Sequence, residues 1–283
     1  MLFSAVHIDW SNVTDVHFEE MTYSDCMSLF QQAPRLIKCS ITTEDAGNTP
    51  HFNTPFIHPS LTHLTIVFDE YDTPDGLLDL ISLPALQEMN YTFEKPKYNS
   101  FISLLERSGC DLTSLSLTNP NPPTSEDLAN LLRNTSSLEN FALQTPHIPP
   151  GFFELFTPPE PKNVCMGNPI FLPLLRTFQY TGSDSHISWK SFIEAAKSIL
   201  RRQMHDDMPL PSFEFVLDLK EKESHSDPSQ AEPNEVSVAR LCGLIDRGIG
   251  LKISNGSEDL LQRAKRRYEA ERFGVGIWDE ESE

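Results

Sequence analysis

Leu112-Thr113-Ser114-Leu115-Ser116-Leu117 decides the fold, because it places leucine at positions one, four and six of a hexamer. Five further hexamers carry apolar residues at the same positions, and they begin at Val13, Leu36, Leu61, Leu86 and Leu138. The six starting positions are 23, 25, 25, 26 and 26 residues apart. One such hexamer arises easily by chance, whereas six at nearly constant spacing indicate an internal repeat.

The segments between the hexamers carry helix signals. Ser24 is expected to cap a helix that places Cys26, Leu29, Phe30 and Ala33 on one face. Further helix starts are predicted at Asp72-Thr73-Pro74, at Asn99-Ser100 and at the capping box Thr124-Ser125-Glu126-Asp127. Each unit is therefore predicted to contain a strand, a turn, a helix and a second turn.

These units predict an α/β fold of leucine-rich-repeat type, whose repeats are about 20–29 residues long. A single unit cannot bury both its strand and its helix, so the units must stack on one another. We expect a right-handed, curved solenoid with a parallel sheet on its concave face and helices on its convex face.

One such solenoid is predicted over residues 1–272, with regular repeats at 10–143 and longer, irregular repeats at 144–272. Strands are expected at Leu175–Tyr180 and Leu210–Phe215, and helices at Ser188–Arg202, after Asn234 and from Ser257 to about Arg272. Loops are predicted at 144–170, which is rich in proline, and at 220–235, which is charged. Phe152, Phe153 and Phe156 are expected to hold the first loop against the repeats. Residues 273–283 are predicted to form a mobile acidic tail.

The composition argues against several classes of partner. The chain of 283 residues has 22 Lys and Arg against 41 Asp and Glu, a formal net charge of −19, which disfavours nucleic acid and anionic membranes as partners.

The sequence has neither an apolar run of about 20 residues nor the pattern of a signal peptide, so a cytoplasmic or nuclear location is expected. The five cysteines are widely spaced, which favours free thiols over zinc ligands or disulfides.

No catalytic, cofactor-binding or metal site is predicted. His17 and His63 lie two repeats apart, too far to share a metal ion. Ser183, Asp184 and His186 are close in sequence, but no nucleophile elbow surrounds either Ser183 or Ser185, so a turn is expected there. The sequence also lacks a glycine-rich phosphate loop. The chain is therefore expected to be non-enzymatic.

The concave face is the predicted binding surface, because repeat proteins generally bind partners there. In each hexamer the residue between positions four and six points to this face. The predicted partner-binding residues are His17, Ser40, Thr65, Asn90, Ser116, Gln179 and Glu214.

The units resemble the leucine-rich-repeat region of fungal F-box proteins. The resemblance rests on Trp10–Phe18, on Cys26–Leu36 with its Ala-Pro-x-Leu ending, and on the related stretches Leu83-Pro84-Ala85-Leu86 and Leu172-Pro173-Leu174-Leu175. In that family an F-box of about 40 residues docks an adaptor of a cullin–RING (SCF) ubiquitin ligase, and the repeats capture the protein to be ubiquitinated.

The resemblance therefore implies the substrate-recognition part of such a ligase subunit. The F-box itself is not found in this sequence, so binding of the SCF adaptor is expected only if an F-box lies upstream. The chain is then expected to be either the C-terminal part of a longer product or a repeat protein without the ligase link. The alternative is a regulatory or inhibitory repeat protein that sequesters a basic protein partner and has no connection to ubiquitin.

Overall fold

The computed structural model describes residues 8–43, 55–68, 75–93, 98–157, 171–182, 187–203, 213–219, 233–255 and 258–273. These residues form two compact units. The first unit contains the described residues up to Pro150 together with 171–175, and the second contains 151–157 and the described residues from Arg176 onwards. None of the helices in these ranges has the length and apolar character needed to cross a membrane.

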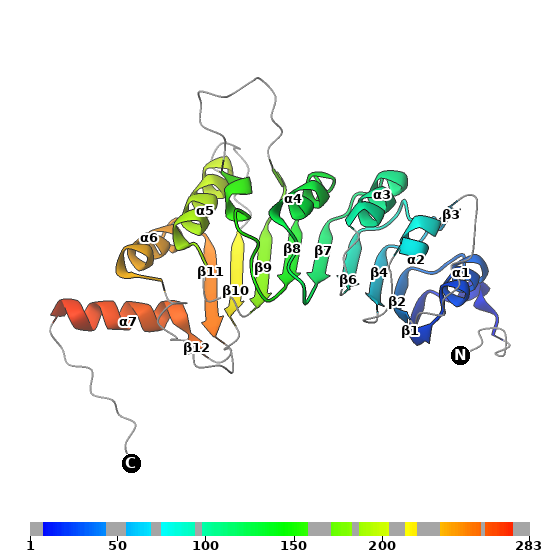
Figure 1. Cartoon of the computed structure of the whole chain (residues 1–283), viewed down its shortest axis with the longest axis horizontal. Helices are drawn as coiled ribbons and strands as arrows, with labels where there is room; N and C mark the ends of the chain where they lie inside the picture. Colours follow the sequence, from blue (N-terminus) through cyan, green and yellow to red (C-terminus); the bar gives the residue numbers. More distant parts are fainter. Residues whose placement is uncertain are drawn as a thin grey trace, which may run out of the picture. The chain divides into compact units, whose positions relative to one another are not determined.

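The first unit is an α/β structure with a parallel sheet. Its main sheet has the strand order β1-β2-β4-β6-β7-β8, and each of these strands is parallel to its neighbours. The bounds are β1 Asp15–Met21, β2 Lys38–Thr43, β4 His63–Phe68, β6 Glu88–Thr92, β7 Ser114–Thr118 and β8 Asn140–Gln144. The helices are α1 Tyr23–Gln32, α2 Asp75–Leu80, α3 Tyr98–Ser108 and α4 Ser125–Arg133, and they lie along the same side of the strands (Figure 1). A second, two-stranded parallel sheet pairs β3 Phe56–Ile57 with β5 Ile81–Ser82.

The predicted hexamers align in register across this sheet. The fourth positions Val16, Cys39, Leu64, Met89 and Leu115 are paired in sequence order, and Leu115 is paired with Phe141. From Leu36 to Leu143, positions one, four and six of every hexamer are at most 3% exposed. The predicted repeat spacing is therefore the spacing at which neighbouring strands bury equivalent side chains against the helices.

The first hexamer is less well covered. Val13, Val16 and Phe18 are only half-buried, and Trp10, from the 3-10 helix Trp10–Asn12, packs against Phe18 with the ring centroids 6.0 Å apart. Between Phe18 and Met21 the register with β2 shifts by one residue, and Glu20 adopts a φ of 58°. This geometry is that of a β-bulge, a feature common at sheet edges.

Two helices start with the same threonine cap. The Thr124 side chain accepts the backbone N–H of Asp127 at 3.1 Å, which is the first bond of the predicted capping box, and the Thr124 hydroxyl donates to the Asp127 carboxylate at 2.6 Å. In α1 the cap is Thr22, which contacts Asp25 in the same way. The prediction that Ser24 caps α1 is therefore wrong, because Thr22 is the residue whose side chain reaches a free N–H of the first turn. Cys26, Leu29, Phe30 and Ala33 are all buried, as expected.

The recurring Pro-x-Leu sequence forms a tight turn at three places in the chain. The Leu36 N–H donates to the Ala33 carbonyl at 3.1 Å, and equivalent bonds join Leu86 to Leu83 and Leu175 to Leu172. The second residue of each of these turns is a proline, whose fixed φ favours that position. The turn from Thr135 to Leu138 has the same bond at 3.1 Å but carries Ser136 in place of proline.

Ser136→Pro should therefore stabilise the first unit. Ser136 is exposed, and the three equivalent turns accept proline at this position without losing their hydrogen bond. Because proline reduces the conformational freedom of the unfolded chain, the expected gain is about 0.4–1 kcal/mol in the free energy of unfolding. Denaturant titration of Ser136→Pro measures the free energy of unfolding, and Ser137→Pro, at the next position of the turn, is titrated for comparison. A loss of stability in Ser136→Pro would show that the four turns are not equivalent.

A ladder of shared carbonyl groups joins the starts of the strands. The Ile37 carbonyl accepts the N–H groups of Thr62 and His63, at 2.9 and 3.0 Å, and the Thr62 carbonyl accepts those of Gln87 and Glu88. The carbonyls of Thr14, Gln87 and Thr113 repeat this pattern with the next strand. The ladder therefore links each strand start to the next by two backbone hydrogen bonds to one carbonyl.

The second unit contains a group of four hydrogen-bonded strands. Its strands are β9 Thr177–Gly182, β10 Glu214–Leu219, β11 Gly250–Asn255 and β12 Glu258–Asp259, of which only β12 is antiparallel to its neighbour. The helices are α5 Trp189–Gln203, α6 Glu235–Ile245 and α7 Leu260–Phe273. Asn234 caps α6 as predicted, with its side chain accepting the Ser237 N–H at 2.9 Å.

A cluster of phenylalanines forms the core of this unit. Phe153 and Phe156 belong to a 3-10 helix, η3 (Phe153–Phe156), and together with Phe152 they are at most 4% exposed. The Phe192 ring on α5 lies 5.2 Å from the Phe153 ring and 4.8 Å from the Phe215 ring. The predicted anchoring of this insertion by its phenylalanines is therefore confirmed.

The register of β10 differs from the prediction. Gln179 pairs with Val216, and Glu214 pairs with Thr177, so Gln179 and Glu214 are not equivalent positions. The error has a physical cause: Phe213, Phe215, Leu217 and Leu219 alternate over seven residues, so a shift by two residues buries an equally apolar set. The predicted side of the strand is unaffected by such a shift.

Several predicted segments fall on residues that the structure does not describe. These are 158–170 of the first predicted loop, 220–232 of the second and 274–283 of the tail. The turn predicted around Ser183–His186 also lies outside the described residues. The extent predicted for one continuous repeat domain stays a prediction.

Candidate functional site

One face of the sheet in the first unit is polar and accessible. In β2, β4, β6, β7 and β8 alternate residues are buried against the helices, and in β1 the equivalent Val16 and Phe18 are half-buried; the residues between them are exposed or half-buried. We call this side the open face. It carries Asp15, His17 and Glu19 of β1, Lys38, Ser40 and Thr42 of β2, His63, Thr65 and Val67 of β4, Glu88, Asn90 and Thr92 of β6, Ser114, Ser116 and Thr118 of β7, and Asn140, Ala142 and Gln144 of β8.

Five of the predicted binding residues are aligned on the open face. His17, Ser40, Thr65, Asn90 and Ser116 occupy consecutive register positions across β1, β2, β4, β6 and β7. The other two, Gln179 and Glu214, are exposed on β9 and β10 of the second unit. The first unit therefore gathers five of the seven residues in one row, which we call the central row.

A parallel row lies at the start of the strands. Asp15, Lys38, His63 and Glu88 are paired in register, followed by Ser114 and Asn140. We call these six positions the charged row, because its first four members are ionisable. A shallow groove of about 570 Å³ lies over both rows between β1 and β6, and it is lined by Asp15, Val16, His17, Lys38, Cys39, Ser40, His63, Thr65 and Glu88.

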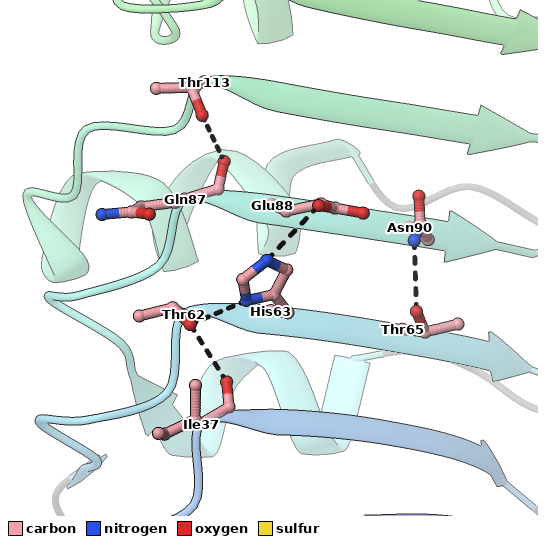
Figure 2. Close-up of polar contacts among 8 residues, drawn as sticks. All are labelled: Ile37, Thr62, His63, Thr65, Gln87, Glu88, Asn90 and Thr113. Atoms are coloured by element: carbon pink, nitrogen blue, oxygen red, sulfur yellow. Dashed lines mark hydrogen bonds and ion pairs between the residues drawn. The ribbon is translucent and has the colours of Figure 1, made fainter. Parts of the chain in front are cut away.

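His63 is held between two neighbours in this groove. Its Nδ1 lies 2.7 Å from Thr62 Oγ1, and its Nε2 faces Glu88 Oε2 at 3.5 Å (Figure 2). Thr62 Oγ1 in turn donates to the Ile37 carbonyl at 3.2 Å. The side chains of His63 and Glu88 are 38% and 41% exposed, so the pair is oriented by the sheet and still open to solvent.

The central row is made of small hydrogen-bonding groups. Asn90 Nδ2 donates to Thr65 Oγ1 at 3.2 Å, which leaves the Asn90 carbonyl oxygen and the Thr65 hydroxyl proton for another partner (Figure 2). Ser40 and Ser116 lie on either side of this pair in the register. Because these side chains are small, another polypeptide can approach the central row closely. The row offers that polypeptide both hydrogen-bond donors and acceptors.

The charged groups of the open face are not neutralised within it. Among the described residues, no lysine or arginine forms an ion pair with Asp15, Glu19 or Glu88. The contacts of these acids are with histidines, His63 for Glu88 and His17 for Glu19, the latter at 3.9 Å. These accessible carboxylates, which pair with no lysine or arginine among the described residues, can bind cationic side chains of another molecule.

Sequence reasoning did not single out the residues that orient His63. Thr62 is the second residue of the hexamer that begins at Leu61, a position to which the pattern assigns no role. Its role follows from its position beside His63 at the start of β4 and above the Ile37 carbonyl of the previous repeat. Thr113 repeats the arrangement one strand after Gln87, with its hydroxyl donating to the Gln87 carbonyl at 3.1 Å (Figure 2). Threonine occupies this position in three of the six hexamers, at Thr14, Thr62 and Thr113, and this recurrence is the signal that was available.

The described residues contain few other chemical groups of note. Within these ranges no three histidine, cysteine or acidic side chains converge as metal ligands. Cys26 and Cys39 are buried, and burial raises the pKa of the free Cys39 thiol to about 12, so this thiol stays protonated.

Comparison with known proteins adds no family to this description. The sequence matches no known protein family, and a search of curated proteins finds no match to it.

Proposed function

We propose that the chain is a non-enzymatic protein-interaction module of leucine-rich-repeat type, and that it binds its partner on the open face. The observation that carries this proposal is the accessible polar surface of the open face, with its aligned hydrogen-bonding row and with carboxylates that pair with no lysine or arginine of the described residues. Regularly spaced strand–helix units with a free sheet surface support the repeat type, since proteins of this type bind partners on their sheets.

Two roles are compatible with such a module. By the resemblance of its repeats, it would be the substrate-recognition part of an F-box protein of a cullin–RING ubiquitin ligase. In the alternative it is a regulatory protein that sequesters a basic partner, for which the net charge of −19 is the supporting observation. Co-precipitation of the SCF adaptor with the full-length gene product separates the two roles.

A triple variant tests the binding face itself. Thr65→Arg, Asn90→Arg and Ser116→Arg place three long cations along the central row and leave the buried face unchanged. We expect partner capture to be lost, because bulk and unpaired charge at an interface oppose binding. Stability should change little, since surface substitutions usually cost within about 0.5 kcal/mol each.

The matched control places three arginines on the helices, at Gln31, Asn99 and Asn130, which are exposed on α1, α3 and α4. Partners co-precipitated with each variant are compared by mass spectrometry after circular dichroism confirms folding. Retention of every partner by the triple variant of the open face, with loss in the helix control, would place the binding surface on the helices.

A further inference from the structure

We infer that the groove of the first unit binds an extended segment of a partner protein with the pattern basic–x–acidic–x–basic. The inference rests on the proposed function and deepens it by assigning the chemistry of the partner. It follows from the order of charges along the charged row, where Asp15, Lys38, His63 and Glu88 occupy four neighbouring strands in register.

The spacing of the row selects the pattern. Neighbouring strands lie about 4.8 Å apart, so Asp15 and Glu88, three strands apart, are separated by about 14 Å, with Lys38 and His63 between them. An extended peptide that crosses the strands advances about 3.3 Å per residue, so the side chains of residues i, i+2 and i+4 lie on one side of it at intervals of about 7 Å. Residues i and i+4 then reach Asp15 and Glu88, and residue i+2 lies between Lys38 and His63.

The charges decide which side chains fit. Lysine or arginine at i and i+4 would pair with the carboxylates of Asp15 and Glu88, which have no lysine or arginine partner among the described residues. An aspartate or glutamate at i+2 would meet the Lys38 ammonium group and the imidazole of His63, whose ring is oriented by Thr62. His17 and Glu19, the remaining ionisable groups of β1 on this face, interact with each other at 3.9 Å.

The floor of the groove supports a peptide in this orientation. Ser40, Thr65 and Asn90 lie alongside the charged row, and their hydroxyl and amide groups can bond the peptide backbone. The pattern reads the same in both directions, so the charges do not fix the direction of the bound segment. An acidic peptide or a nucleic acid lacks the two cations and would face Asp15 and Glu88 with like charge.

Selection from a phage-displayed library of random dodecapeptides tests the inference with the full 283-residue chain. Selected peptides are expected to be enriched in the basic–x–acidic–x–basic pattern. A synthetic peptide with this pattern should bind at least about threefold more tightly than a scrambled peptide of equal composition, and salt should weaken its binding. Fluorescence polarisation measures both quantities.

A charge-swapped variant provides the decisive arm. This variant carries Asp15→Lys, Lys38→Glu and Glu88→Lys, and it should select peptides with the opposite pattern, acidic–x–basic–x–acidic. Because the variant gains binding to new peptides, misfolding cannot explain its loss of binding to the original ones. The control variant Glu106→Lys, Glu126→Lys and Arg133→Glu makes the same exchange at exposed positions of α3 and α4 and should keep the original preference.

The possible failures can be told apart. The inference would be overturned if the selected peptides lack the pattern, or if the charge swap does not invert it. In that case the open face would still be the binding surface if the three central-row arginines abolish binding of those peptides. Recovery of no peptide at all would also overturn the inference, because it requires a linear segment. Peptides that still bind the triple arginine variant would contradict the proposed function itself.

Discussion

Phe192→Ala is expected to lower the free energy of unfolding of the second unit by about 3–5 kcal/mol. Phe192 is fully buried, and its ring contacts Trp189 of the same helix, Phe153 of η3 and Phe215 of β10. Its removal leaves a cavity at the point where three elements meet, which neighbouring side chains fill only in part. Thermal or chemical unfolding followed by near-ultraviolet circular dichroism measures the loss.

Lys190→Ala, two residues earlier on the exposed side of α5, is the control and should stay within about 0.5 kcal/mol of the wild type. Because the chain contains two compact units, the unfolding curve of Phe192→Ala should be examined for a second transition. Equal stability of Phe192→Ala and Lys190→Ala would contradict the phenylalanine core.

Leu115→Ala should destabilise the first unit by about 2–5 kcal/mol, whereas Ser116→Ala should change its stability by less than about 0.5 kcal/mol. The two residues are adjacent in β7, but Leu115 is 1% exposed and faces the helices, while Ser116 lies on the open face. Successive side chains of a strand point to opposite sides, so the pair tests the assignment of the two faces directly.

Urea titration of both variants gives the comparison. If the two substitutions lowered the free energy of unfolding by similar amounts, the assignment of Leu115 to the buried side of β7 and of Ser116 to the open face would be wrong. Leu131→Ala on α4 is a useful companion, because Leu131 is fully buried and belongs to the helix that follows β7. It should match Leu115→Ala in size.

The periodicity of the sequence determined most of the architecture. The hexamers predicted which residues of β2, β4, β6, β7 and β8 are buried, and the register follows their spacing. The capping box at Thr124 and the asparagine at 234 predicted two helix starts correctly. These features could be predicted because they depend on residues that are close in sequence or repeated at a fixed interval.

The cap of α1 and the register of β10 could not be predicted in the same way. Thr22, Ser24 and Asp25 can all cap a helix, and only the path of the chain out of β1 decides that Thr22 does so. In β10 more alternating residues are apolar than the hexamer pattern requires, so the sequence alone fits two registers. Pairing with the neighbouring strand β9 decides between them.

The sequence by itself determined the α/β class, the inward leucines and the polar central row, because side-chain alternation and helix capping are local properties. The row of Asp15, Lys38, His63 and Glu88 also follows from the third position of each hexamer, and the strands pair these residues in register. Only the tertiary structure decided that Thr62 orients His63 toward Glu88, and that the carboxylates of this row have no lysine or arginine partner among the described residues. The contact between His63 and Glu88 joins residues 25 positions apart. Such relations depend on the distances and directions of side chains on neighbouring strands, which the register brings together in space.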